Sequence, residues 1–343
     1  MILSRCYGGK MGRIQSLSGL KVMAVFGVLA CHMGLVPAFD LCARMVEILF
    51  IISGFLMAYN YHEKFEDYSL LSGFKVIYGK LWRFYPVHLI TFLLQLFFVE
   101  FWVLKPLGYK LSIGGLNLSL LHAWFVDTEF SFNNVSWFLS ALLFCYLITP
   151  GLAGIVKGVK RVWMLFVAIF VVRLFFEYVV INERRYVYLD LHCNPFIQSL
   201  NYAMAYILGV WFGSKNSVNE YLKEKAKGFE ISAIQVLMFL LYWVCCYFFN
   251  GGYRIFFVGI GLGLVMVLAY TNGIVSKILS KRLFLIFEGI TLEIFMFHSF
   301  ILYHFPVNGA KPITYLTFFC ITLLVSVMYH LVYTGVKKRF LVK

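Results

Sequence analysis

Long apolar segments separated by short polar connections dominate this sequence. A membrane-spanning helix needs about 20 mostly apolar residues, because each residue advances the helix by about 1.5 Å through a hydrocarbon layer about 30 Å thick. Ten segments meet this requirement. The pattern therefore predicts an all-α polytopic membrane protein with spans at residues 17–36, 41–60, 84–104, 135–156, 162–181, 195–213, 229–249, 253–272, 283–304 and 313–335.

Residues 105–134 form the longest connection between two predicted spans. This connection contains the stretch LSIGGLNLSLLHAWFV, which we expect to be a re-entrant or interfacial helix. No internal repeat and no appended soluble domain are evident along the chain. We therefore expect residues 1–343 to form a single integral-membrane domain.

The composition excludes a soluble globular protein. Hydrophobic residues make up 62% of the chain, charged residues make up only 13%, and the mean hydropathy is +0.83. A soluble domain cannot hide that much apolar surface from water. The eight cysteines show no metal-ligand spacing, so we expect no metal site.

The formal net charge of +14 reflects membrane topology and not nucleic-acid binding. The basic residues do not form one patch, but follow the N-terminal segment, alternate connections and the C-terminal segment. Cytoplasmic segments of membrane proteins carry an excess of Lys and Arg. This distribution predicts that both termini are cytoplasmic and that the chain interacts with the lipid bilayer, with no nucleic-acid partner.

Two ionisable residues lie inside the first predicted span, where they are costly and need a functional reason. Lys21 lies near its expected cytoplasmic end and His32 lies near its outer end. Eleven residues are close to three helical turns, so both side chains project from nearly the same face, about 16 Å apart along the axis. We interpret this face as cationic at one end and basic or nucleophilic at the other.

Glu47 lies early in the second predicted span, at a depth similar to that of His32 if the two spans form a short hairpin. A carboxylate beside an imidazole orients its tautomer and favours its protonated form, as a general base requires. The alternative is that Glu47 pairs with Arg44, three residues earlier. Gly54 falls on the same helix face as Glu47 and permits close approach of a ligand or of another backbone.

A second basic group precedes the third predicted span, in the stretch GKLWRFYP. Lys80 and Arg83 are three residues apart, so they share a face if this stretch is helical. Pro86 then lies in the first turn of the span, where its missing N–H is tolerated. Alone, this is ordinary juxtamembrane positive charge. Together with Lys21 at the same level, it forms a cationic cluster suited to phosphate groups.

Five sequence blocks occur in a defined order along the chain. They are IQSLSGLKVMAVFGVLACH, EILFIISGFL, GKLWRFYP, NNVSWFLSALLFCYLITP and GITLEIFMFHSFIL. These blocks resemble those of acyltransferase family 3, integral-membrane O-acyltransferases of bacterial surface glycans. The resemblance covers nearly the whole chain, and the correct order and spacing of five blocks make it specific.

The resemblance implies an acyl-CoA co-substrate bound at the cytoplasmic face and a hydroxyl acceptor, usually on a sugar. It implies acetyl-CoA as the donor, with succinyl as the alternative acyl group. The implied acceptor is a surface glycan or exopolysaccharide, or a lipid-linked saccharide precursor. The implied location is the bacterial inner membrane, and the chain is most similar to the short, exopolysaccharide-modifying members.

The same resemblance assigns roles to individual residues. His32 matches the essential histidine of the family, and Glu47 matches its aspartate at the start of the second span. Lys21, Lys80 and Arg83 match positions that bind the donor, although the family carries arginine at the first two. Lysine keeps the positive charge but lacks the bidentate fork for phosphate, so the departures leave the reaction class intact.

Three further residues are candidates for binding the acceptor substrate. Asn134 and Trp137 open the fourth predicted span, where an amide and an indole ring would suit a sugar. Interfacial anchoring explains Trp137 equally well. His298 falls in the outer half of the ninth predicted span, at a depth similar to that of His32, and matches a frequent family histidine.

Three classes of function are compatible with these residues. The first is an O-acyltransferase in which His32 takes the proton of a sugar hydroxyl during direct transfer, or forms a transient acyl-imidazole. The second is a transporter or proton-coupled exporter that uses a buried His32–Glu47 pair, although the chain shows no repeated halves or paired broken helices. The third is a scaffold, which needs no cationic site and no deep histidine.

Overall fold

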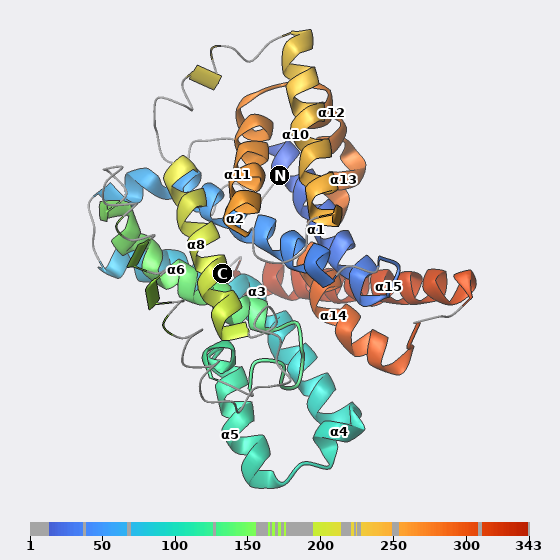
Figure 1. The fold of residues 1–343 in the computed structure, drawn as a ribbon. Coiled ribbons are helices and arrows are strands. Elements are labelled where there is room, and N and C mark those ends of the chain that lie inside the picture. Colours follow the sequence, from blue (N-terminus) through green and yellow to red (C-terminus); the bar gives the residue numbers. More distant parts are fainter. Residues whose placement is uncertain are drawn as a thin grey trace.

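The described part of the chain is built from helices and contains no β-strand. The computed structural model describes residues 14–36, 39–66, 70–125, 128–155, 195–213, 228–248, 254–307 and 311–341, and single residues between 164 and 175 and between 221 and 224. The elements shown in Figure 1 are α1 (Gln15–His32), α2 (Phe39–Glu66), α3 (Leu70–Phe98), α4 (Glu100–Val103), α5 (Leu107–Leu118), η1 (His122–Trp124), α6 (Trp137–Ile155), α8 (Pro195–Gly213), α10 (Phe229–Phe248), α11 (Arg254–Tyr270), α12 (Ile274–Leu279), α13 (Arg282–Glu288), α14 (Thr291–His304) and α15 (Pro312–Leu341).

The predicted all-α membrane class agrees with these helices. Each predicted span corresponds to a helix or a broken helix, except 162–181, which falls largely outside the described residues. Within those residues, five helices are long and apolar enough to cross a membrane, or six if the bent pair α13–α14 forms one span. The count of ten spans and the cytoplasmic position of both termini stay predictions.

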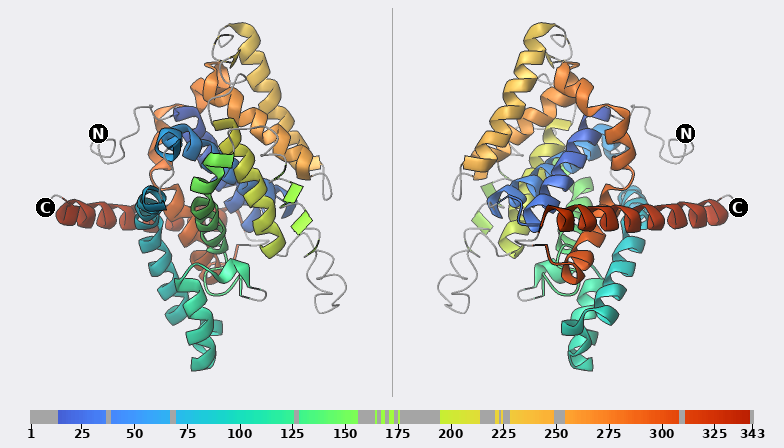
Figure 2. Two further views of the ribbon diagram at one scale, coloured as in Figure 1. Left: turned by 90° about the vertical axis from the view of Figure 1, so that its left-hand side faces the viewer. Right: turned by 90° about the vertical axis from the view of Figure 1, so that its right-hand side faces the viewer.

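The first two helices lie at the centre of the fold. α1 packs on α2, α12, α13 and α14, and α2 packs on α6, α8 and α11. In an 18-residue apolar window of α2, 89% is buried inside the protein, against 17% in the corresponding window of α15. Figure 2 shows the C-terminal end of α15 projecting beyond the other helices. Polar groups on α1 and α2 are therefore surrounded by protein.

The third helix begins earlier than predicted, and this corrects the position expected for Pro86. α3 starts at Leu70, so Pro86 lies in the helix interior and not in a first turn. A proline there leaves the carbonyl four residues earlier without its helical N–H donor. That carbonyl belongs to Trp82, and it accepts a 3.0 Å hydrogen bond from the hydroxyl of Tyr333 on α15. A distant helix thus satisfies the group that the proline leaves unpaired.

Glycines bring α2 and α8 into direct backbone contact. A Cβ atom at Gly54 would lie 2.1 Å from the carbonyl oxygen of Tyr206, and one at Gly209 would lie 2.3 Å from that of Ile51. Helices in membranes pack closely where small residues meet. The sequence left open whether a ligand or another backbone approaches Gly54. The structure shows that the backbone of α8 does. This contact fixes the depth of α2 in the fold.

The predicted span 283–304 is broken into two helices. α13 and α14 meet at an angle of 61° around Gly289 and Ile290. The hydroxyl of Thr291, at the start of α14, donates a 3.1 Å hydrogen bond to the carbonyl of Glu288, at the end of α13. The break therefore places the end of α13 and the start of α14 within the fold, where both helices pack on α1.

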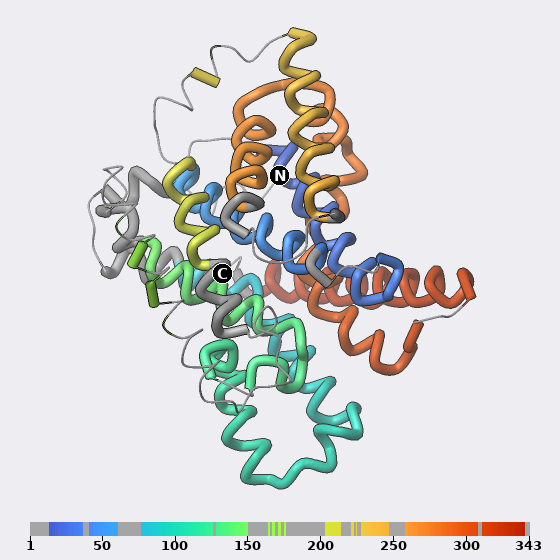
Figure 3. The backbone as a smooth tube through the Cα atoms, in the orientation of Figure 1, coloured from blue at the N-terminus to red at the C-terminus, as the bar shows by residue number. Residues whose placement is uncertain are grey.

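Residues 105–134 contain the helix expected there, in the form of α5. The tube in Figure 3 shows α4 and α5 projecting together from the rest of the fold. Buried hydrogen bonds hold this segment in place. His88 Nε2 on α3 bonds to Asn117 O on α5 at 2.9 Å, and His122 Nε2 on η1 bonds to the hydroxyl of Ser136, just before α6, at 3.0 Å. The interfacial or re-entrant character of this segment stays a prediction.

We predict that Gly54→Ala destabilises the protein by about 1–3 kcal/mol, because the added methyl group would overlap the α8 backbone. Gly259→Ala is the matched control, since a Cβ atom there meets no heavy atom within 4 Å. The measurement is the thermal unfolding midpoint of each variant in detergent. Equal midpoints for wild type and Gly54→Ala would contradict the close α2–α8 contact.

Candidate active site

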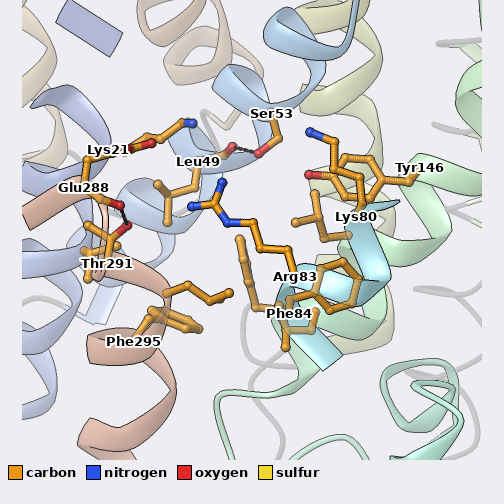
Figure 4. Close-up of a pocket in the computed structure, with 15 residues that line it drawn as sticks. Lys21, Leu49, Ser53, Lys80, Arg83, Phe84, Tyr146, Glu288, Thr291 and Phe295 are labelled. Carbon is orange, nitrogen blue, oxygen red and sulfur yellow. Dashed lines mark hydrogen bonds between the residues drawn. The ribbon is translucent and has the colours of Figure 1, made fainter. Parts of the chain in front are cut away.

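Three cationic side chains from two helices line one cavity, as the sequence predicted. Lys21 comes from α1, and Lys80 and Arg83 come from one turn of α3. Figure 4 shows the three side chains around the same space. We call this cavity the basic pocket. Its volume is about 180 Å³, and its lining residues are Lys21, Val25, Leu49, Ser53, Lys80, Arg83, Phe84, Phe138, Leu139, Leu142, Tyr146, Glu288, Thr291, Leu292 and Phe295.

Polar and aromatic groups complete the basic pocket. The Lys80 Nζ atom lies 5.7 Å from the centroid of the Tyr146 ring, within cation–π range. Arg83 is exposed, and its guanidinium has no hydrogen-bond or ion-pair partner among the residues that the structure describes. Its N–H donors therefore remain for a ligand. The broken helix adds one carboxylate to the lining, that of Glu288.

The other end of α1 borders a second cavity. His32 lines it together with Asn134, which lies in the loop before α6, so two of the predicted site residues share this cavity. We call it the His32 pocket. Its volume is about 480 Å³, and its lining residues are His32, Gln95, Val99, Phe101, Trp102, Phe130, Phe132, Asn134, Ser299, Leu302 and Tyr303.

The hydrogen bonds of His298 define the tautomer of His32. His298 Nδ1 lies 2.6 Å from the carbonyl oxygen of Phe295, which can only accept, so this nitrogen carries a proton. His298 is fully buried and therefore neutral, which makes its Nε2 atom an acceptor. That atom lies 2.8 Å from His32 Nδ1, so His32 Nδ1 is the donor. The Nε2 atom of neutral His32 is left unprotonated and can act as a base.

A thiol group contacts the unprotonated Nε2 atom of His32. Cys42 Sγ lies 3.6 Å from His32 Nε2. A thiol is a weak donor, whereas an alcohol is a stronger one. A substrate hydroxyl that reached His32 Nε2 could therefore replace this contact at little cost.

The structure corrects the expected pairing of Glu47 with His32. Glu47 Oε2 lies 2.5 Å from Arg44 Nη1, and both side chains are buried. The Tyr242 hydroxyl donates a 2.8 Å hydrogen bond to the backbone carbonyl of Arg44 and so fixes this turn of α2. A buried carboxylate needs an opposite charge, and the residue one turn earlier supplies it. The imidazole of His298 takes the place beside His32 that was expected for Glu47.

The two other acceptor-side candidates are not among the lining residues of the His32 pocket, and their contact with a substrate stays a prediction. His298 is buried beside His32, in line with the similar depth expected for the two residues. Trp137 packs against the hydrophobic core at the start of α6 and is not among the lining residues of the His32 pocket. The sequence could not distinguish these roles, because a Trp at the start of a span suits both core packing and sugar binding.

Sequence reasoning missed most residues that line the His32 pocket. Gln95 and Trp102 lie within a stretch read as an ordinary span, because their polar and aromatic side chains have no distinctive spacing there. Ser299 follows His298 directly, but its contact with Asn134, an Oγ···Oδ1 distance of 2.5 Å, joins residues far apart in sequence. The sequence gives no signal for the break after Phe98, because the apolar pattern continues where the helix ends.

One turn of α14 connects the two pockets. The side chain of Phe295 lines the basic pocket, while its backbone carbonyl accepts the hydrogen bond from His298. The Phe295 ring also packs against Phe138, with ring centroids 5.2 Å apart. The group that orients His32 is therefore built on the wall of the basic pocket.

The two pockets differ in what they could hold. The basic pocket has three cationic groups and suits an anionic group such as phosphate. The described residues that line the His32 pocket include no Lys, Arg, Asp or Glu, which suits a neutral ligand. In the described part of the chain, no group of three or more His, Cys, Asp or Glu side chains could hold a metal ion.

Comparison with known proteins decides the family. The profile of the family described as "Acyltransferase domain", acyltransferase family 3, matches residues 14–331. The chain belongs to acyltransferase family 3. The five sequence blocks that carry the resemblance, both pockets and the His32–His298 pair all lie within the matched residues.

A curated relative supports the same family. Acyltransferase MdmB from Streptomyces mycarofaciens is 29% identical over an alignment of 171 residues, and the match covers 44% of this chain and 42% of that protein. The match thus spans less than half the length of that relative. No solved structure matches the chain.

We predict that Glu47→Gln destabilises the protein by about 3–5 kcal/mol, because it removes the carboxylate that balances the charge of the buried Arg44 guanidinium. Replacing both residues by Met should restore most of the loss, since no unpaired buried charge then remains. The measurement is the unfolding midpoint of the single and double variants. A double variant less stable than Glu47→Gln would contradict a mainly structural ion pair.

Proposed function

We propose that this chain is a membrane O-acyltransferase that moves an acyl group from acyl-CoA to a hydroxyl of a saccharide. The observation that carries the proposal is the placement of His32. Its Nε2 atom is held as an acceptor at one end of α1, and the basic pocket lies toward the other end. Membership of acyltransferase family 3 supports the reaction class, and the long apolar helices support a membrane location.

The donor in this proposal is acyl-CoA, bound through its phosphates in the basic pocket. Lys21 and Lys80 act as point charges, while Arg83 offers a planar fork that matches phosphate oxygens. The guanidinium of Arg83, which has no partner among the described residues, supports this role. We propose acetyl as the acyl group, with succinyl as the alternative.

The length of α1 fits a donor that spans both pockets. α1 is continuous from Gln15 to His32, so Lys21 and His32 lie about 16 Å apart along its axis. An extended phosphopantetheine arm has about this reach. With its phosphates in the basic pocket, the coenzyme would present its thioester near His32, on the side where the acceptor enters.

The transfer needs one base. His32 Nε2 accepts the proton of the acceptor hydroxyl while the hydroxyl oxygen attacks the thioester carbonyl carbon. The C–O ester bond forms, the C–S bond breaks, and the imidazolium returns the proton to the departing CoA thiolate. His32 is then back in its starting tautomer. A transient acyl-imidazole is the alternative route to the same products.

In this mechanism His298 is a positioning residue. It accepts the Nδ1 proton of His32 and so keeps the lone pair on Nε2. It also stabilises the imidazolium that forms during transfer, because a hydrogen bond to a charged donor is stronger than one to a neutral donor. Glu47 does not take this role here, since it is paired with Arg44.

The acceptor and its location follow from the same site. We propose a surface glycan or exopolysaccharide, or its lipid-linked saccharide precursor, as the acceptor, and the bacterial inner membrane as the location. The transporter alternative depended on a buried His32–Glu47 pair. The ion pair of Glu47 with Arg44 removes its main structural support.

We predict that His32→Ala lowers acyl transfer by a factor of about 10²–10⁴ and leaves CoA binding unchanged, because it removes the base but not the basic pocket. Acyl transfer is followed as ester signals in the NMR spectrum of the host's surface polysaccharide, at matched membrane abundance. CoA binding to the purified protein is measured by calorimetry. An unchanged ester signal in His32→Ala would contradict the proposed base.

The basic pocket is tested separately with Arg83→Gln. We expect it to weaken CoA binding by about tenfold, since a charge-assisted fork to phosphate is lost. Lys311→Gln is the matched control, because it removes an exposed positive charge outside the pocket. If both variants bind CoA as the wild type does, the phosphates do not lie in the basic pocket.

We predict that His298→Leu lowers kcat by about 10²-fold with little change in the KM for acyl-CoA, because His32 then loses the acceptor that selects its tautomer. His298→Gln should recover much of the rate, since its amide oxygen can accept the same proton. A merely structural role would not produce this recovery. Equal rates for Leu and Gln at this position would count against the positioning role.

A further inference from the structure

A buried amide faces the His32 pocket without a partner. Gln95 lies on α3, is only 3% exposed and lines this pocket. Among the residues that the structure describes, its side-chain amide makes no hydrogen bond. Its amide nitrogen and oxygen are not among the fully buried side-chain atoms without a partner in the described residues, so they reach the space of the pocket. The Gln95 amide therefore offers a donor and an acceptor to a ligand in this pocket.

Aromatic rings also line the His32 pocket. Trp102, on α4, stacks against Phe132 with ring centroids 4.7 Å apart and an interplanar angle of 28°. The Phe101 ring meets Trp102 edge-on, also at 4.7 Å. Trp102 is half-buried, so part of its ring borders the pocket. An indole held rigidly by two neighbours offers a flat apolar surface at little entropic cost.

The backbone at Phe132 is strained where it holds this wall. Phe132 has φ of 56°, in the left-handed region that non-glycine residues rarely adopt. The Asn133 amide donates a 3.0 Å hydrogen bond to Met296 O on α14, and Asn134 contacts the Ser299 hydroxyl. Strain of this kind persists where surrounding contacts enforce it, often at ligand clamps. The loop is thus tied to the turn of α14 that carries His298.

The chemistry of the lining selects the class of ligand. An anionic ligand would find no Lys or Arg among the described residues of this lining, in contrast to the basic pocket. A hydrocarbon chain would leave the amide of Gln95 unpaired. A neutral polyhydroxyl ring satisfies both walls, because its C–H face packs on an aromatic ring and its hydroxyls bond to amides. The volume of about 480 Å³ lies in the usual range of small-molecule sites.

We propose that the His32 pocket is a saccharide subsite, in which Trp102 supports the sugar ring and Gln95 and Asn134 bind its hydroxyls. One further hydroxyl then lies at His32. This assignment rests on the proposed acyltransferase function and adds to it the residues that select the acceptor. Gln95 and Trp102 are specificity-determining residues of this subsite.

The test measures saccharide binding without requiring acyl transfer. The probes are the methyl glycosides of glucose, galactose, mannose, rhamnose and N-acetylglucosamine, added to the purified protein in lipid nanodiscs. Binding is followed by saturation-transfer NMR, and CoA affinity is measured on each sample by calorimetry. Retained CoA affinity shows that a variant is folded.

We expect Gln95→Leu and Trp102→Ala to weaken binding of the best glycoside by about tenfold or more, because each removes one wall of the subsite. Trp102→Phe should bind within about twofold of the wild type, since a ring remains. Phe97→Ala is the control on α3, because that side chain is 65% exposed and lies outside the pocket lining.

Adding acetyl-CoA to the same samples separates the two proposals. Glycosides that bind and lose affinity in Gln95→Leu, but form no ester, would support the subsite and overturn the proposed function. Ester formation with an unchanged glycoside KM in Gln95→Leu and Trp102→Ala would support the function and overturn the subsite. Absence of binding by any glycoside to the wild type would also overturn the subsite.

Discussion

The hydrogen bond from His32 Nδ1 to His298 Nε2 is the interaction on which the chemistry of this site depends. It has a direction only because the Phe295 carbonyl fixes the proton of His298 on Nδ1. Through these two hydrogen bonds, a backbone carbonyl on α14 determines that the Nε2 atom of His32, on α1, carries a free lone pair. Neither histidine needs a carboxylate to be oriented, and the base stays neutral in an apolar surrounding where an ion pair would be costly to bury.

The same constraint, that a buried polar group must find a partner, explains where other side chains lie. Glu47 is paired with Arg44 on its own helix, because a charge desolvated in the core is most simply compensated one turn away. The Trp82 carbonyl, unpaired because of Pro86, is bonded by Tyr333 from α15. The Gln95 amide finds no partner among the described residues, but it opens onto the His32 pocket, where a ligand can bond to it.

The sequence predicts much of the fold because apolar length and helix rise are local properties. Runs of about 20 apolar residues locate the helices, and the spacing of Lys21, Lys80 and Arg83 brings three cations to one pocket. The start of α3 was misplaced because Pro86 was read as a boundary, although a distant hydroxyl lets the helix continue through it. The His32–His298 and Asn134–Ser299 contacts join residues far apart in sequence, so no local pattern could reveal them.

The two pockets differ in the charges that line them. One contains three cations, and the described lining of the other includes no Lys, Arg, Asp or Glu, yet one turn of α14 borders both. A donor with charged phosphates and a neutral acceptor would be sorted by this difference alone, since each is poorly solvated in the pocket of the other. The reacting ends of both would then meet near His32, whose lone pair is set by the turn that separates them. In this arrangement, specificity for the two substrates and the placement of the base come from the same short stretch of backbone.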